Sequence, residues 1–219
     1  MICASIADCT VEECIGATRV HALAEVRIDR LEGVSEEGIR KIFSSKGRKG
    51  KLVAACRPNP KMDDAKRKAL LLAAISAGAD YVDIEVESSD AYERKIVEKA
   101  KSAGCKIIVS YHNYEKTPAW EELKQVVRWC LDSGADIAKV ACKANSERDC
   151  VRLLSLLDSE NRMIVVGMGK KGEITRVVAP LLGSLFTYAP AFPGKETAEG
   201  QIPKDELEKR IRSVSDGKA

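Results

Sequence analysis

The sequence predicts a single (β/α)8 barrel, the TIM barrel fold. Three observations favour it: eight short apolar runs, a helical pattern after most of them, and a glycine that recurs between a helix and the next strand. Strands that alternate with helices indicate parallel β/α units rather than hairpins. The chain of 219 residues lies at the short end of the size range for this barrel. A doubly wound open sheet has the same rhythm and remains an alternative.

The predicted strands are spaced so that one helix fits between most neighbours. In chain order they are Ile2–Ile6, Glu25–Asp29, Lys51–Cys56, Tyr81–Val86, Lys106–Tyr111, Ile137–Ala141, Met163–Val166 and Leu185–Tyr188. Gly78, Gly104 and Gly134 each stand between a predicted helix and a strand, where a left-handed residue can end the helix. No linker divides the chain, so we expect one domain over residues 1–219 with a frayed tail after about residue 213.

The charge balance excludes a strongly basic nucleic-acid binder. The chain has 36 basic and 33 acidic residues, and the one dense basic cluster, residues 46–51, is expected to be a solvated loop. No apolar run approaches the ~20 residues that span a bilayer. The N-terminus lacks the basic stretch of a signal peptide, so the expected location is the cytoplasm.

The eight cysteines do not form a metal-binding pattern. None stands in a C-x-x-C pair, and the chain has only two histidines, which argues against a zinc site. We expect most of these cysteines to be buried free thiols, with a disulfide as the alternative for a hyperthermophile.

Charged and polar side chains interrupt strands that a barrel would fill with apolar residues. Because side chains alternate along a strand, residues two apart share a face. The polar positions are Glu25, Arg27 and Asp29 on the second strand, Arg57 at the end of the third, Asp83 and Glu85 on the fourth, Ser110 and His112 on the fifth, and Lys139 in the sixth. Buried charges are costly unless they are paired or bound to a ligand. A structural ion-pair network is one interpretation of these residues. We favour an active site at the carboxyl end of the barrel, because polar side chains from five strands would meet there.

Two of these residues have side chains suited to chemistry. Lys139 lies in an apolar strand, and a buried lysine in its neutral form attacks carbonyl groups to give a Schiff base. The alternative is a structural ion pair with Glu25 or Glu85. His112 is placed to relay protons, although a structural histidine remains possible at this position. His21 falls in the first helical segment, where packing or surface exposure is expected.

A glycine-rich turn follows the seventh predicted strand. Residues 167–172 match the pattern G-x-G-x-x-G, but the turn follows the seventh strand and not the first. We therefore interpret it as a β/α loop rather than a dinucleotide site. Arg176, just after this turn, has a planar guanidinium that suits the binding of a substrate carboxylate. The alternative is a solvated arginine on the surface.

Taken together, these residues resemble the type I 3-dehydroquinate dehydratase family, the Schiff-base enzymes of the shikimate pathway and hence of aromatic amino acid biosynthesis. The matching pieces occur in family order along nearly the whole chain. They are Glu25-Val26-Arg27-Ile28-Asp29, Arg57, Ser110-Tyr111-His112-Asn113 with Lys116-Thr117-Pro118, Asp136-Ile137-Ala138-Lys139, Met168-Gly169-Lys170 with Arg176, and Gly200-Gln201-Ile202.

The resemblance implies a hydro-lyase that converts 3-dehydroquinate to 3-dehydroshikimate without a metal or a diffusible cofactor. Lys139 would form the imine with the substrate ketone, and His112 would move the protons. The remaining family roles concern substrate binding: Arg176 and Gln201 for the carboxylate, Glu25, Arg27 and Arg57 for the hydroxyls, and Ser5 and Thr197 as further members of the same shell. The partner is the small-molecule substrate, with no nucleic acid and no membrane, and the chain would act as a monomer or a homodimer.

The sequence departs from the family in two places. An acidic residue and two glycines usually follow the arginine of the third strand, and that acid orients the histidine. Here the residues after Arg57 are Pro58-Asn59-Pro60, so Asp63, Asp64 or another group would have to take this part. Thr197 stands where serine is common, in a loop from Phe192 to Gln201 that we expect to act as a lid.

Two other functions remain open. A Schiff-base aldolase on the same barrel would also use Lys139, but it would need a phosphate cup rather than a carboxylate clamp. A barrel that only binds a polyhydroxy acid would retain its ligand after loss of Lys139 and would show no turnover.

Overall fold

Eight parallel strands form a nearly closed barrel in the computed structural model, which describes residues 1–45, 47, 50–158 and 162–217. The strands are β1 (Ile2–Ile6), β2 (Leu23–Arg27), β3 (Lys51–Ala55), β4 (Tyr81–Glu85), β5 (Lys106–Asn113), β6 (Ile137–Lys143), β7 (Met163–Met168) and β8 (Thr187–Pro190). They pair in the order β7-β6-β5-β4-β3-β2-β1-β8, and the backbone N–H of Leu185, just before β8, donates to the carbonyl of Met163 in β7 at 3.0 Å. This sequential order confirms the (β/α)8 barrel and excludes the doubly wound sheet, in which the strand order reverses.

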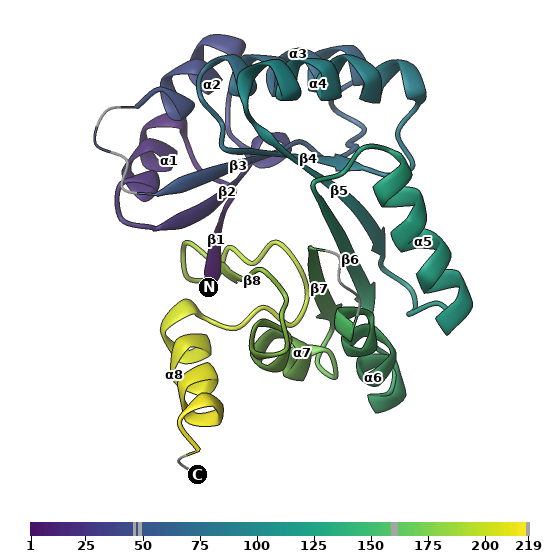
Figure 1. Cartoon of the computed structure of the whole chain (residues 1–219). Helices are drawn as coiled ribbons and strands as arrows, with labels where there is room; N and C mark the ends of the chain where they lie inside the picture. Colours follow the sequence, from purple (N-terminus) through teal and green to yellow (C-terminus); the bar gives the residue numbers. More distant parts are fainter. Residues whose placement is uncertain (46, 48–49, 159–161, 218–219) are drawn as a thin grey trace.

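The helices lie around the outside of the strands (Figure 1). They are α1 (Val11–Thr18), α2 (Glu36–Phe43), α3 (Asp64–Ser76), α4 (Asp90–Ala103), α5 (Trp120–Asp132), α6 (Glu147–Ser155), α7 (Glu173–Val178) and α8 (Lys204–Ser215), with short 3-10 helices η1 (Ile28–Arg30), η2 (Leu156–Asp158) and η3 (Ala179–Leu181). None of the helices in the described residues is long and apolar enough to cross a membrane. The last helix, α8, continues to Ser215, two residues beyond the point where we expected fraying.

Glycines end several of these helices as expected. Gly78, Gly104 and Gly134 have φ values of +98°, +68° and +87°, the left-handed conformation that other residues adopt at a cost. The prediction that residues 46–51 form a solvated loop is tested only in part, because residues 46, 48 and 49 lie outside the described residues.

Two sequence-based predictions were wrong in detail. The second strand ends earlier than predicted, and His21 lies after the first helix rather than within it. The strand β2 stops at Arg27, and Asp29 belongs to η1 rather than to the face of Glu25 and Arg27. The Asp29 carboxylate accepts hydrogen bonds from the Arg27 guanidinium and from the backbone N–H of Arg57, and these bonds hold it off the sheet. His21 follows α1, which ends at Thr18, and its Nδ1 lies 3.3 Å from Lys204 Nζ.

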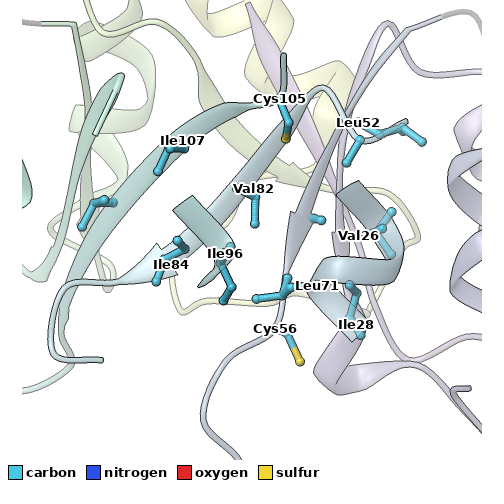
Figure 2. Packing of buried hydrophobic residues seen from close by; sticks show 14 of the residues in the cluster. Val26, Ile28, Leu52, Cys56, Leu71, Val82, Ile84, Ile96, Cys105 and Ile107 are labelled. Carbon is cyan, nitrogen blue, oxygen red and sulfur yellow. The ribbon is translucent and has the colours of Figure 1, made fainter. Parts of the chain in front are cut away.

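The hydrophobic core consists mainly of a layer between the strands and the helices. Figure 2 shows part of it: Val82 and Ile84 on β4 point toward Leu71 of α3 and Ile96 of α4. All eight cysteines are buried and free, as expected. Because side chains alternate along β4, the outward direction of Val82 and Ile84 sends Asp83 and Glu85 into the barrel.

A second apolar cluster fills the barrel interior. It includes Cys3, Leu23, Val53, Ile108 and Ile164, all buried, which lie on the inward faces of their strands. The charged residues follow them toward the carboxyl ends of the same or neighbouring strands. The polar site is therefore built on an apolar floor.

Candidate active site

A pocket of about 440 Å³, part of it open to solvent, lies at the carboxyl end of the barrel. This is the end at which barrel enzymes bind substrate. Its wall consists of Glu25, Arg27, Arg57, His112, Tyr114, Lys139, Ala141, Val166, Met168, Arg176, Tyr188, Thr197, Ala198 and Gln201. Eight of the nine site residues that the sequence suggested are in this wall. The exception is Ser5, which lies behind it and 3.4 Å from the Gln201 side-chain nitrogen.

Strand register brings the polar side chains to one level of the barrel. Glu25 of β2 is paired with Ser5 of β1, and Ser110 of β5 is paired with both Glu85 of β4 and Lys139 of β6. Residues paired across parallel strands point to the same side of the sheet. The inward direction of one of them therefore fixes the others.

Lys139 is buried among two carboxylates and an aromatic ring. Its Nζ lies 2.9 Å from Asp83 Oδ2, 3.4 Å from Glu25 Oε2 and 4.5 Å from the centre of the Tyr188 ring. The lysine side chain is only 5% exposed. The pairing with Glu25 agrees with one of the two sequence-based alternatives, whereas Glu85 contacts other residues instead.

Arg57 binds Asp83 through both terminal nitrogens. Nη1 and Nη2 lie 2.9 Å and 2.6 Å from the two carboxylate oxygens, and Nη1 also contacts the Ser110 hydroxyl and Glu85. Burial by itself would raise the pKa of Asp83, but the positive charges of Arg57 and Lys139 outweigh it and hold that pKa well below its usual range. Asp83 is therefore ionised and shared between two cations.

His112 is held by Glu85. Its Nδ1 lies 3.0 Å from Glu85 Oε2, and its side chain is 11% exposed. Burial and the nearby Arg57 charge lower the pKa of His112, and Glu85 offsets only part of this effect. Burial would raise the pKa of Glu85, but Arg57 and His112 lower it to about 2. At neutral pH, His112 is thus a neutral imidazole beside an ionised carboxylate.

The acid that contacts His112 therefore comes from β4 and not from the segment after β3. Of the two candidates in that segment, Asp63 caps α3 by accepting the backbone N–H of Lys66 at 2.8 Å. Asp64 accepts a hydrogen bond from Arg67 at 2.6 Å. Both carboxylates are occupied by local helix contacts.

Arg176 is a buried cation with unused hydrogen-bonding capacity. It is 1% exposed, and its Nη2 donates to the carbonyl of Glu199 at 3.1 Å. Its Nε has no hydrogen-bond partner among the residues that the structure describes. Burial lowers its pKa to about 10. An arginine in this state suits an incoming carboxylate, which would supply both charge and acceptors.

The loop after β8 lies over one side of the pocket. Gln201 Oε1 accepts the Thr197 backbone N–H at 2.8 Å, and its Nε2 donates to Thr197 Oγ1 at 3.0 Å. At the other end of the loop, Lys195 Nζ donates to the carbonyl of Asp8 at 2.7 Å, and an Arg30 nitrogen donates to the carbonyl of Glu196 at 3.1 Å. The loop before α1 and the helix η1 thus hold the segment after β8 against the barrel.

Tyr114 and Tyr188 line the pocket but were not predicted from the sequence. Tyr188 ends the predicted eighth strand, and that position at a carboxyl end was the signal that could have identified it. Its hydroxyl has no partner among the described residues, and burial raises its pKa well above the usual value. Tyr114 follows β5, and its ring stacks on His112 with the ring centres 6.0 Å apart.

The mouth of this (β/α)8 barrel holds a buried lysine, a neutral histidine and a buried guanidinium whose Nε has no partner among the described residues. This set suits Schiff-base chemistry on a carboxylated substrate. Comparison with known proteins makes the assignment specific. The family model for type I 3-dehydroquinase matches residues 2–217. The chain therefore belongs to the type I 3-dehydroquinase family.

Relatives with assigned functions agree with the family match. The chain is 34% identical over 217 residues to 3-dehydroquinate dehydratase from Methanocaldococcus jannaschii, covering 94% of this chain and 96% of the relative. It is 36% identical over 195 residues to the same enzyme from Methanothermobacter thermautotrophicus, covering 86% of this chain and 83% of the relative.

Solved structures show the same arrangement of strands and helices. The 3-dehydroquinate dehydratase from Aquifex aeolicus is similar with a TM-score of 0.78 at 28% identity, covering 97% of this chain and 98% of that chain. The deoxyribose phosphate aldolase from Aeropyrum pernix has a TM-score of 0.62 at 18% identity, covering 98% and 89%. The second similarity concerns the fold alone.

Proposed function

We propose that Lys139 and His112 carry out the family's reaction, the elimination of water from 3-dehydroquinate to give 3-dehydroshikimate in the shikimate pathway. The observation that carries this proposal is the placement of both side chains in one pocket wall, joined by the charges of Asp83, Arg57 and Glu85. The charged residues of the wall, together with Thr197 and Gln201, then have roles in binding, activation or proton transfer.

Imine formation begins at Lys139. Its ammonium releases a proton to solvent, to which the pocket is open, and the neutral amine attacks the C3 ketone to form a carbinolamine. The carbinolamine hydroxyl takes a proton from solvent and leaves as water, so that a protonated imine remains. Asp83 holds the ammonium less firmly than a carboxylate with one partner would, because Arg57 already neutralises part of its charge. The Tyr188 ring faces the same nitrogen and stabilises its cationic forms.

Elimination then uses the imine as an electron sink. The Nε2 of His112 removes the C2 proton, and the electrons of that bond flow into the protonated imine to form an enamine. The enamine expels the C1 hydroxyl, which takes a proton from His112 and leaves as water. Hydrolysis of the resulting imine consumes one water, releases the product ketone and restores Lys139.

Arg176 and Gln201 bind the substrate carboxylate in this proposal. Arg176 supplies the buried charge and its unused donors, and Gln201 closes the site from the loop after β8. That loop, Phe192 to Gln201, acts as the lid, with Thr197 held by Gln201.

The substrate hydroxyls contact the other polar side chains of the wall. Glu25 and Arg27 reach the pocket from β2, and Arg57 reaches it from the end of β3. Ser5 supports this shell from behind through Gln201.

The test is turnover of 3-dehydroquinate by the purified chain, followed by absorbance of the conjugated ketone that forms. Lys139→Ala is expected to remove turnover, and His112→Ala to slow kcat by roughly 10²–10⁴-fold. The matched control is Lys106→Ala, because Lys106 is an exposed lysine at the start of the neighbouring strand β5. Full activity of Lys139→Ala would refute the assignment.

We also infer that residues 1–219 act as one domain in the cytoplasm, as a monomer or homodimer, without nucleic acid. The eight free, buried thiols support a reducing compartment, and the near-equal numbers of basic and acidic residues support the absence of a nucleic-acid partner. Light scattering during size-exclusion chromatography measures the mass, and a trimer or larger assembly would contradict the inference.

A further inference from the structure

We propose that Glu85 is a positioning residue that fixes the tautomer of His112, so that Nδ1 carries the proton and Nε2 is left as the base. The contact with Glu85 alone does not settle this tautomer, because a neutral imidazole can either donate or accept at Nδ1. Arg57, which binds the other oxygen of Glu85, keeps this carboxyl group ionised, and an ionised carboxylate can only accept the hydrogen bond. The catalytic consequence rests on the proposed function, whereas the tautomer itself does not.

The two oxygens of Glu85 have different partners. Oε2 faces His112 Nδ1 at 3.0 Å, and Oε1 accepts a hydrogen bond from Arg57 Nη1. Arg57 is in turn fixed by its two bonds to Asp83. The Glu85 carboxylate therefore cannot rotate away from the histidine without losing its bond to a buried guanidinium.

With Glu85 ionised beside the Arg57 guanidinium, only one proton arrangement satisfies all these groups. An ionised carboxylate accepts hydrogen bonds and donates none, so the contact with Glu85 requires a proton on His112 Nδ1. Arg57 can only donate, so it competes for the carboxylate but cannot replace the histidine. Because the imidazole is neutral, its second nitrogen carries a lone pair. The positive charges of Arg57 and Lys139 also favour the neutral ring, whereas the negative charge of Asp83 opposes them.

A single substitution is expected to reverse this arrangement. In Glu85→Gln the side chain has one oxygen and one NH2 group. Arg57 offers only donors, so the oxygen must face Arg57 and the NH2 must face His112. Nδ1 then has to accept a hydrogen bond, and the imidazole proton moves to Nε2. The substitution preserves size and shape while it removes the base.

The direct test is 15N NMR of histidine-labelled protein at pH 7.5 without substrate, which reports the protonation of each ring nitrogen. The chain has only two histidines, so His21→Gln assigns the spectrum. The wild-type protein is expected to show His112 protonated on Nδ1 alone, and Glu85→Gln to show it protonated on Nε2 alone. Wild-type His112 with its proton on Nε2, or an unchanged tautomer in Glu85→Gln, would overturn the proposal.

Kinetic measurements connect the tautomer to turnover. Glu85→Gln is expected to lower kcat by roughly 10²–10⁴-fold with little change in KM, the loss expected for a missing general base. Borohydride is still expected to trap an imine on Lys139, because the lysine and its partners are intact. Glu85→Asp retains a carboxylate and is expected to recover part of kcat and to keep the proton on Nδ1.

The matched control is Glu87→Gln, two residues further along the chain, with expected wild-type turnover and tautomer. Circular dichroism confirms that each variant is folded. If Glu85→Gln does not fold, the wild-type spectrum alone still tests the proposal, because a proton on Nε2 of His112 would overturn it. Equal kcat in Glu85→Gln and wild type would contradict the positioning role. Absence of turnover and imine in the wild type would instead refute the proposed function, while the tautomer result would stand on its own.

Discussion

Arg57 and Asp83 form a two-bond ion pair in the middle of the barrel, with Nη1 and Nη2 at 2.9 Å and 2.6 Å from the two carboxylate oxygens. On one side, Asp83 also contacts the amine of Lys139. On the other side, Arg57 contacts Glu85, which holds His112. One continuous chain of charges thus connects the nucleophile to the base.

This arrangement makes the protein sensitive to acid. The pKa of Glu85 is lowered from its ordinary 4.5 to about 2, because Arg57 and His112 outweigh the effect of burial. A carboxyl group with a depressed pKa stabilises the fold above its unfolded pKa, and this contribution is lost as the pH falls from about 4.5 to 2. From the size of that shift, Glu85 contributes on the order of 3 kcal/mol to the free energy of unfolding.

Urea unfolding at pH 7, 4 and 3 measures this effect. The free energy of unfolding of the wild type is expected to fall between pH 4.5 and 2, and Glu85→Gln is expected to lose less over the same range. Equal pH dependence in the two proteins would show that Glu85 is not the group responsible.

Activity is expected to depend on pH through His112. Its pKa is lowered from the ordinary 6.5 by burial and by Arg57, and the neutral form is the active base. The acid limb of kcat/KM, which reports the free enzyme, is therefore expected below pH 6.5, with a plateau from pH 6.5 to 8. A profile measured with saturating and limiting substrate tests this, and an acid limb centred above pH 7 would contradict it.

Replacement of Arg176 by methionine is expected to weaken substrate binding and to leave stability unchanged or improved. The guanidinium is buried, and burial lowers its pKa to about 10, so its charge opposes folding in the absence of a ligand. With Arg176→Met we expect KM to rise at least tenfold and the Tm to stay level or rise. Steady-state kinetics and thermal melts measure the two effects; a normal KM would exclude the clamp.

The side chains of a strand that point into the barrel were predictable, because side chains alternate between the two faces every two residues. Alternation along β4 placed Asp83 and Glu85 on one face, and the apolar neighbours of Lys139 placed its amine inside the barrel. The position of Asp29 was not predictable from alternation. It depends on contacts with Arg27 and with the backbone of Arg57, and the latter lies 28 positions away.

The sequence did not predict which side chains of different strands contact one another. The pairing of Glu85 with His112 depends on strand register and on side-chain rotamers, and Arg57 contacts both Asp83 and Glu85. A pattern along one strand contains neither kind of information. For the same reason, Glu25 could be predicted only as one of two carboxylate partners of Lys139, and the contact with Asp83 came only from the structure.

We propose that Lys139 forms the covalent intermediate, and intact mass after addition of 3-dehydroquinate and borohydride, followed by peptide mapping, tests this directly. We predict an adduct of substrate or product size on Lys139, absent in Lys139→Ala and still present in His112→Ala. An adduct on another lysine, such as Lys143 at the end of the same strand, or no adduct on a folded protein that turns over the substrate, would contradict the account.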